Sequence, residues 1–147
     1  MNNRYRNRER DDICRKKVEN LTAYVRAPDW EKICTGNGEV SFFVKHCLKE
    51  LNITQLRKYF DDLKKLETKL KEESNYKDLS RDLYLIIPKV KYAKSRKLCP
   101  EYFVEFIEES IKTISEADDT NRQVYFNNFM RILEAIVAYH KYYHPKS

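Results

Sequence analysis

The chain has 147 residues, enough for one hydrophobic core and too few for two ordinary domains. Glycine (2) and proline (4) are scarce and 35% of the residues are charged, a composition that disfavours a turn-rich β-sandwich and predicts an all-α fold. No run of about 18 apolar residues exists and the charged N-terminus lacks the apolar centre of a signal sequence, so we expect a cytoplasmic protein without a membrane partner. The formal charge of +6 is compatible with a polyanionic partner but does not require one.

We predict one domain over residues 1–147, folded as a compact bundle of about five to six helices. Residues 1–10 carry four arginines and almost no apolar residue, which predicts a flexible basic arm. Residues 11–26 have apolar positions at helical spacing and form the first predicted helix. Residues 27–38 contain one proline and both glycines, and therefore form a connector, with a short helical turn at 30–34.

Apolar spacing predicts two further helices after this connector. The first covers 39–51, and the second begins after Asn52, with Thr54 as its expected N-cap, and continues to about residue 73. Residues 78–97 repeat the helical pattern, although Pro88 removes a backbone hydrogen bond and should kink the helix. We therefore expect an interrupted helix in this region.

The last two predicted helices differ in character. Pro100 suits the first turn of a helix whose outward positions are mostly glutamate. The final helix, 122–143, has the most continuous apolar stripe in the chain, which predicts a place at the centre of the bundle.

The cysteines and histidines do not form a recognisable catalytic or metal-binding motif. The four cysteines lack a C-x-x-C pair and are expected to be buried free thiols. His140 and His144 have the spacing of a zinc pair, but His140 lies on the apolar stripe, where a hydrogen-bonded structural histidine is the more common outcome. No H-E-x-x-H, G-x-S-x-G or P-loop pattern is present. We predict no catalytic residue, no metal and no cofactor; a Cys47 and His140 pair remains the less favoured enzymatic alternative.

The segment 89–97 is strongly basic, with no acidic residue between Asp82 and Glu101. On a helix, Lys89, Tyr92 and Arg96 would share one ridge, with Lys91 beside it. Cations next to an aromatic ring suit an RNA backbone with a stacked base or ribose. The same pattern also fits a solvated face, or a face paired with the acidic helix that follows.

Three stretches, "NITQLRKYFDDL", "LIIPKVKYAKSRK" and "FMRILEAIVAYHKYY", resemble in order and separation the small subunit of type III-A (Csm) CRISPR effector complexes. The resemblance covers about residues 40–143, and the third stretch is the most specific. It implies a non-catalytic helical subunit of a CRISPR antiviral defence complex, stacked in several copies along a filament of backbone subunits beside the duplex of guide RNA and target RNA. Its partners would also include the large subunit.

The charge pattern and the resemblance together define a set of expected RNA-binding residues. They are Arg57, Lys58, Lys89, Lys91, Tyr92, Arg96, Lys97 and Lys141. An exposed edge of the final helix, with Tyr139, Lys141, Tyr142 and Tyr143, would meet RNA or another subunit. The resemblance also implies that His140 contacts RNA phosphates or a neighbouring subunit. The alternative is a protein-interaction module that docks through its acidic helix without binding RNA. A homodimer is a further expectation, formed by exchange of the N-terminal helix across the connector.

Overall fold

The computed structural model describes residues 3–146, and these residues contain helices but no strand. The elements in chain order are α1 (Asn3–Arg26), α2 (Trp30–Cys34), α3 (Glu39–Phe42), the π-helix η1 (Phe43–Cys47), α4 (Ile53–Glu72), α5 (Leu79–Tyr84), α6 (Ile86–Ser95), α7 (Glu101–Glu116) and α8 (Asp119–Tyr143). The all-α prediction is confirmed.

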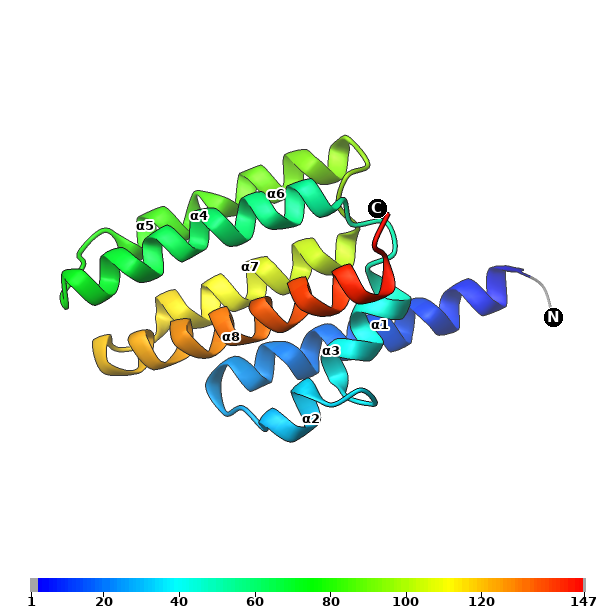
Figure 1. The fold of residues 1–147 in the computed structure, drawn as a ribbon, viewed down its shortest axis with the longest axis horizontal. Coiled ribbons are helices and arrows are strands. Elements are labelled where there is room, and N and C mark those ends of the chain that lie inside the picture. Colours follow the sequence, from blue (N-terminus) through cyan, green and yellow to red (C-terminus); the bar gives the residue numbers. More distant parts are fainter. Residues whose placement is uncertain (1–2, 147) are drawn as a thin grey trace.

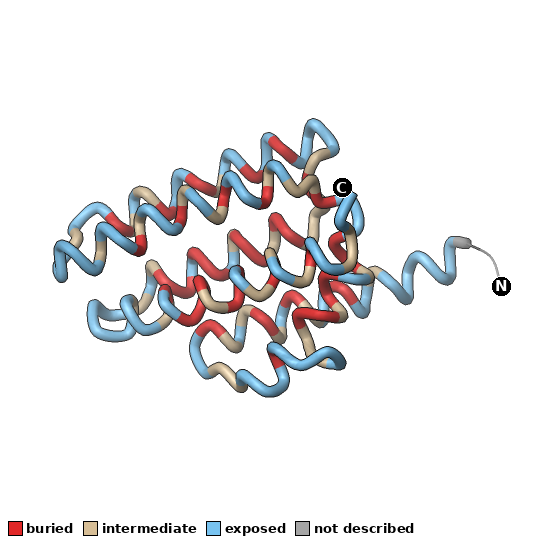
Figure 2. Tube along the Cα trace, in the orientation of Figure 1, coloured by how far each residue is buried: buried red, intermediate tan, exposed pale blue. Residues whose placement is uncertain are grey.

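The helices are arranged in three layers (Figure 1). In the first layer α4 runs beside α5 and α6, α7 and α8 form the middle layer, and α1, α2 and α3 lie on the other side. Buried positions line the inner sides of all three layers (Figure 2). The predicted central position of the final helix is confirmed, because α8 packs against α1, α3, η1, α4 and α7.

A chain of aromatic rings joins the middle layer to the segment after the connector. Phe43 of η1 lies 6.3 Å from Phe106 of α7, which lies 5.7 Å from Phe129 of α8, which in turn lies 6.5 Å from Phe126 (ring centroids). All four side chains are fully buried. Burying each ring stabilises the fold by about 1.5–3 kcal/mol, so this chain is a major part of the core.

The N-terminal helix is longer than the sequence suggested. In the structure α1 begins at Asn3. The sequence predicts a flexible arm over residues 1–10 and a helix that begins only at Asp11. Residues 4–10 are exposed and extend beyond the bundle as a continuation of the same helix (Figure 1). Arginine is a good helix former, and no proline or glycine interrupts the segment. Met1 and Asn2, which belong to the expected arm, lie outside the described residues.

The N-cap of α4 is Asn52, so the expectation of Thr54 was wrong. The Asn52 backbone is extended and its side-chain oxygen accepts a hydrogen bond from the Gln55 amide at 3.2 Å. Thr54 lies inside the first turn, where its backbone is already helical. The helix predicted over 39–51 also ends early, at Cys47, and a turn that joins the Leu51 amide to the Leu48 carbonyl leads into Asn52.

Pro88 divides the expected fourth helix into α5 and α6. The break falls at Leu85, three positions before the proline. In a continuous helix the residue at position 88 would donate its amide to the Tyr84 carbonyl. Proline has no amide hydrogen, and its ring would clash with that carbonyl, so the helix cannot continue straight through this point. In α6 the proline occupies the third position, where the amide it lacks would have no partner within the helix. The predicted interruption is confirmed.

The expectation of four buried free thiols holds only for Cys99. Cys14 of α1 and Cys47 of η1 form a disulfide, while Cys34 is exposed and free and Cys99 is buried and free. The two bonded cysteines are 33 residues apart, a spacing that carries no motif, and only the packing of α1 against η1 brings them together. Closing such a loop stabilises the fold by about 3–4 kcal/mol.

No helix in the described part of the chain is both long enough and apolar enough to cross a bilayer.

Thiol labelling checks this cysteine assignment. We expect Cys34 alone to react quickly with an aromatic disulfide reagent in the native protein. Cys99 should react only on unfolding, because burial raises the pKa of its thiol to about 12 and blocks access. Cys14 and Cys47 should react only after reduction. Three or four fast-reacting thiols in the unreduced native protein would contradict the assignment.

The two connector glycines should respond differently to substitution. A Cβ at Gly38 would lie 2.4 Å from the Lys32 carbonyl oxygen and 2.9 Å from the Thr35 carbonyl oxygen, whereas a Cβ at Gly36 meets nothing within 4 Å. Gly38→Ala should therefore lower the free energy of unfolding by about 1–3 kcal/mol, because backbone must move. Gly36→Ala is the matched control, and urea unfolding measures both; equal effects would contradict the close approach at Gly38.

Candidate nucleic-acid interface

The outer side of α6 carries the central part of the candidate interface. Ile86, Val90 and Ala93 are buried against the middle layer, so the opposite side of the helix faces solvent. Lys89, Tyr92 and Arg96 are exposed on it, at spacings of three and four; with the next residue, Lys97, we call them the outer ridge.

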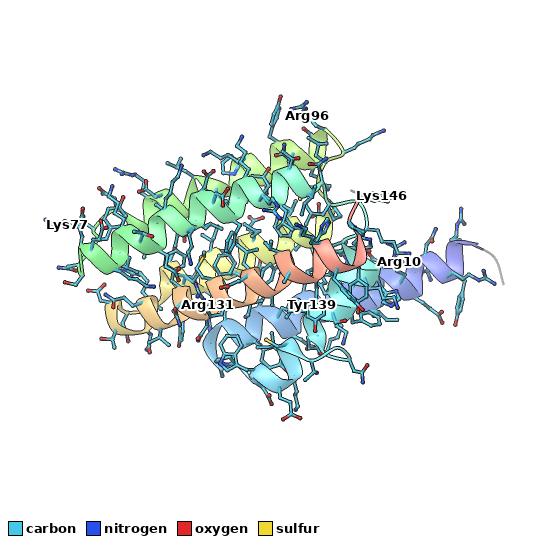
Figure 3. The ribbon with its side chains drawn as sticks, viewed as in Figure 1. Arg10, Lys77, Arg96, Arg131, Tyr139 and Lys146 are labelled. Carbon is cyan, nitrogen blue, oxygen red and sulfur yellow. A yellow bond between two sulfur atoms is a disulfide. The ribbon has the colours of Figure 1, made fainter. Side chains whose placement is uncertain are left out.

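Tyr92 and Arg96 are placed to act together. The Tyr92 side chain is 65% exposed, and the Arg96 guanidinium carbon lies 5.8 Å from the centre of its ring. Figure 3 shows Arg96 at the outer end of α6, pointing away from the bundle. A cation beside an open aromatic face can bind a phosphate and stack a base or ribose at one place.

Lys97 ends the helix in an unusual conformation. Its φ of 62° lies in the left-handed region, which favours glycine. The Leu98 amide donates to the Ala93 carbonyl and the Lys97 amide to the Lys94 carbonyl, both at 2.9 Å, which is the hydrogen-bond pattern of a Schellman motif. The strained residue turns the chain sharply back toward the core at Leu98 and leaves the Lys97 side chain exposed.

Two other cations of the basic segment are on the α7 side and are already paired. Lys91 lies 3.2 Å from a Glu108 carboxylate oxygen, and Lys94 contacts the carboxylate of Glu101. Both glutamates belong to α7. Lys91, which the sequence placed among the RNA-binding residues, is therefore separated from the outer ridge and partly neutralised.

The first turns of α4 lie beside the end of α6. The Tyr59 hydroxyl donates to the Lys89 carbonyl at 3.3 Å, and the Asn52 amide donates to the Leu98 carbonyl at 3.0 Å. This antiparallel contact places the first turns of α4 beside α6, and Lys58, next to Tyr59, is exposed. Segments more than thirty positions apart in sequence thus lie side by side.

Arg57 and Lys141 meet in a separate hollow between α4 and α8. The hollow has a volume of about 560 Å³ and an apolar floor of Phe60 and Val137. Tyr142, 75% exposed, stands at its edge. Phe60 was not among the site residues predicted from the sequence. Phe60 follows Arg57 by three positions on the same helix, and this spacing could have placed the two side chains on one face.

The tyrosines of the expected aromatic edge of α8 differ in their surroundings: two make hydrogen bonds within the chain and one is exposed to solvent. The Tyr139 hydroxyl donates to the Cys34 carbonyl at 2.6 Å, and the Tyr143 hydroxyl lies 2.6 Å from the Ser41 hydroxyl. These two tyrosines attach α8 to the connector and to α3. Lys141 and Tyr142 remain as the exposed groups of this edge.

The histidine pair is structural. His140 is fully buried, and its Nε2 lies 2.7 Å from the Leu51 carbonyl, so we assign the proton to Nε2. His144 Nε2 lies 3.0 Å from the Val44 carbonyl. Within residues 3–146 no three histidine, cysteine or acidic side chains gather closely enough to hold a metal ion. The preference for a hydrogen-bonded His140 is confirmed. The contact of His140 with RNA or a neighbouring subunit, which the resemblance implied, was wrong, because the ring is completely buried.

These observations describe an all-helical protein whose solvent-facing chemistry is cationic and aromatic. The family model for Csm2 Type III-A matches residues 37–146, which is most of the chain and includes every element from α3 to α8. The chain therefore belongs to this family, the small subunits of type III-A CRISPR effector complexes, and the resemblance seen in the sequence is confirmed. No curated protein and no solved structure matches the chain.

The burial of His140 predicts a pH dependence of stability. Burial, and to a lesser degree the neighbouring His144, lower the pKa of His140 below its usual value, against the opposing effect of the Leu51 carbonyl. The unfolded chain takes up a proton near pH 6.5 while the folded protein resists it, so stability present above pH 6.5 is lost as the pH falls below that value. The loss should reach up to about 1.4 kcal/mol per pH unit.

Urea unfolding at pH 7.5, 6.5 and 5.5 measures this effect. His140→Gln should flatten the dependence of unfolding free energy on pH. Burial also lowers the pKa of His46, so His46→Gln is the comparison variant that separates the contribution of His46 from that of His140. An NMR titration of the His140 ring provides a second measurement if the variant folds poorly. A ring that titrates at or above pH 6.5 in the native protein would disprove the assignment.

Proposed function

We propose that this small subunit contacts the guide RNA and the target RNA through the outer ridge and Lys58, with Arg57 and Lys141 as a second contact. The cations neutralise backbone phosphates and thus supply affinity that does not depend on sequence. Tyr92 adds stacking. The subunit itself is non-catalytic and contributes positioning along the backbone filament.

The observation that carries this proposal is that the exposed cations of the proposed contact have no carboxylate partner within the described residues. Among the described residues, Lys89, Arg96 and Lys97 form no ion pair with a carboxylate, and neither do Arg57, Lys58 and Lys141. Lys91 and Lys94, two turns or less away, are paired. Cations that lack a carboxylate partner within residues 3–146 therefore occur together on the outer side of α6 and at the start of α4.

The alternative, docking through the acidic helix, has less support. Glu101, Glu105 and Glu108 of α7 are engaged by Lys94, Arg15 and Lys91 of the same chain. These contacts occupy the carboxylates that a basic partner would need. The acidic character of α7 is explained by its neighbours within the bundle.

The role of His140 supports a non-catalytic subunit. A general base needs an accessible nitrogen within reach of a substrate proton, and His140 is buried with Nε2 committed to a backbone carbonyl. Association with the backbone and large subunits, with further copies of this chain, and a cytoplasmic location are the remaining parts of the proposal.

Filter binding across a salt series tests the RNA contact. We expect replacement of Arg57, Lys89 and Arg96 by alanine to weaken binding to duplex and single-stranded RNA. The slope of log affinity against log salt should become shallower by about 2–3, since each lost phosphate contact removes roughly 0.7–0.9.

A control with the same charge change lies away from the outer ridge. Alanine at Arg26, Lys71 and Lys77 removes three exposed cations that, among the described residues, also form no ion pair with a carboxylate, and it should leave most of the slope intact. Equal losses in both variants would show that only the net charge matters, and an unchanged slope in the first variant would refute the RNA contact.

A further inference from the structure

The first turns of α1 form a second basic feature, far from the outer ridge in sequence. Residues 4–10, the α1 projection, carry Arg4, Arg6, Arg8 and Arg10 against the single carboxylate of Glu9, and all of these residues are exposed. The helix stands clear of the bundle in Figure 1, and Figure 3 shows Arg10 where it leaves the bundle. Its base, at Arg10, contacts the His46 carbonyl of η1.

A hollow lies at the base of the projection. It has a volume of about 290 Å³; we call it the projection hollow, and its lining includes Arg6, Arg10, Ile13, Phe42, His46 and Lys49. Ile13 is 46% exposed there, a large apolar side chain among cations.

Two links hold the walls of this hollow in place. The Arg10 Nε donates to the His46 carbonyl at 3.2 Å, and the disulfide between Cys14 and Cys47 joins α1 to η1 one turn further along. The hollow is thus a fixed feature of the bundle and not a gap beneath a loose arm.

The charges of the projection oppose its own helix. Arg4 and Arg8, and likewise Arg6 and Arg10, stand four apart, the spacing at which like charges repel. Arg4 and Arg6 also lie in the first turn, at the positive end of the helix dipole. At the hollow, burial followed by the charges of Lys45, Lys49 and Arg10 lowers the pKa of His46. Carboxylates from outside the chain would offset the repulsion between Arg6 and Arg10 and the charges gathered around His46.

The lining favours a protein over an RNA strand. The Phe42 ring is covered by His46, 4.5 Å away between centroids, and by the Lys17 ammonium at 5.0 Å, so it offers no open face to a base. The outer ridge and the α4–α8 hollow differ in this respect, because Tyr92 and Tyr142 each have one ring neighbour, Arg96 and Tyr143, and are 65% and 75% exposed. Arginine forks with an exposed apolar side chain between them suit carboxylates on a partly apolar segment.

A second copy of this chain offers a poorer match. Its exposed acidic turn before α8 has already committed Asp118 to the Asn121 amide and Asp119 to Arg122. The projection also lies outside residues 37–146, the part of the chain that the family model covers. We propose that the projection hollow docks an acidic, partly apolar segment of a different subunit of the effector complex. This inference rests on membership in the complex and not on RNA contact.

The test titrates this chain into the effector complex assembled without it. Arg6→Glu with Lys49→Glu should weaken incorporation by at least about tenfold, because two attractive charge pairs become repulsive. Arg4→Glu with Arg8→Glu makes the same charge change away from the hollow and should stay within roughly threefold of the wild type. Ile13→Ser, which changes no charge, should also weaken incorporation. Circular dichroism confirms that each variant folds.

A photo-crosslinker then identifies the partner. Arg6→p-benzoylphenylalanine in the assembled complex should label an Asp- or Glu-rich peptide of another subunit. Crosslinks to RNA, crosslinks to a second copy, or equal losses in the two double variants would overturn the proposal. The RNA affinity of the isolated Arg6 and Lys49 variant should keep the salt slope of the outer ridge, so that failure here and failure of the RNA contact give different results.

Discussion

The structure depends on the packing of α7 and α8 against all the longer helices around them. Their apolar sides are buried from both directions, since α1 covers one face and α4, α5 and α6 cover the other. The outer ridge follows from this arrangement. α6 must place Ile86, Val90 and Ala93 inward, and the opposite positions are then presented to solvent in a row.

Ion pairs within the chain determine which cations of the basic segment remain available to bind a polyanion. The basic segment has one flank against α7, where glutamates neutralise Lys91 and Lys94, and one flank toward α4, where no carboxylate pairs with Lys89 or Arg96 among the described residues. Lysines that look equivalent in a charge count thus have different roles. Those facing α7 support the packing of two helices, and those facing outward are free to meet a polyanion.

The two basic features of the molecule differ in their aromatic neighbours. The outer ridge has an open tyrosine beside its arginine, and the projection hollow has a covered phenylalanine and an exposed isoleucine. Stacking on an open ring suits nucleic acid, whereas an apolar side chain among guanidinium groups suits a protein segment. The proposed RNA contact and the proposed docking site for a protein segment therefore rest on different aromatic and apolar neighbours.

The sequence by itself determined the helical class, the approximate helices, the interruption at Pro88 and the family, because apolar spacing, proline geometry and the "EAIVAYHKYY" pattern are local properties. It also anticipated the buried role of His140 from its place on an apolar stripe. Only the tertiary structure decided that Cys14 meets Cys47, that Lys91 is paired, and that Arg57 and Lys141 share a hollow. Each of these depends on which helix lies beside which, and helical periodicity specifies the inward face of a helix without specifying its neighbour.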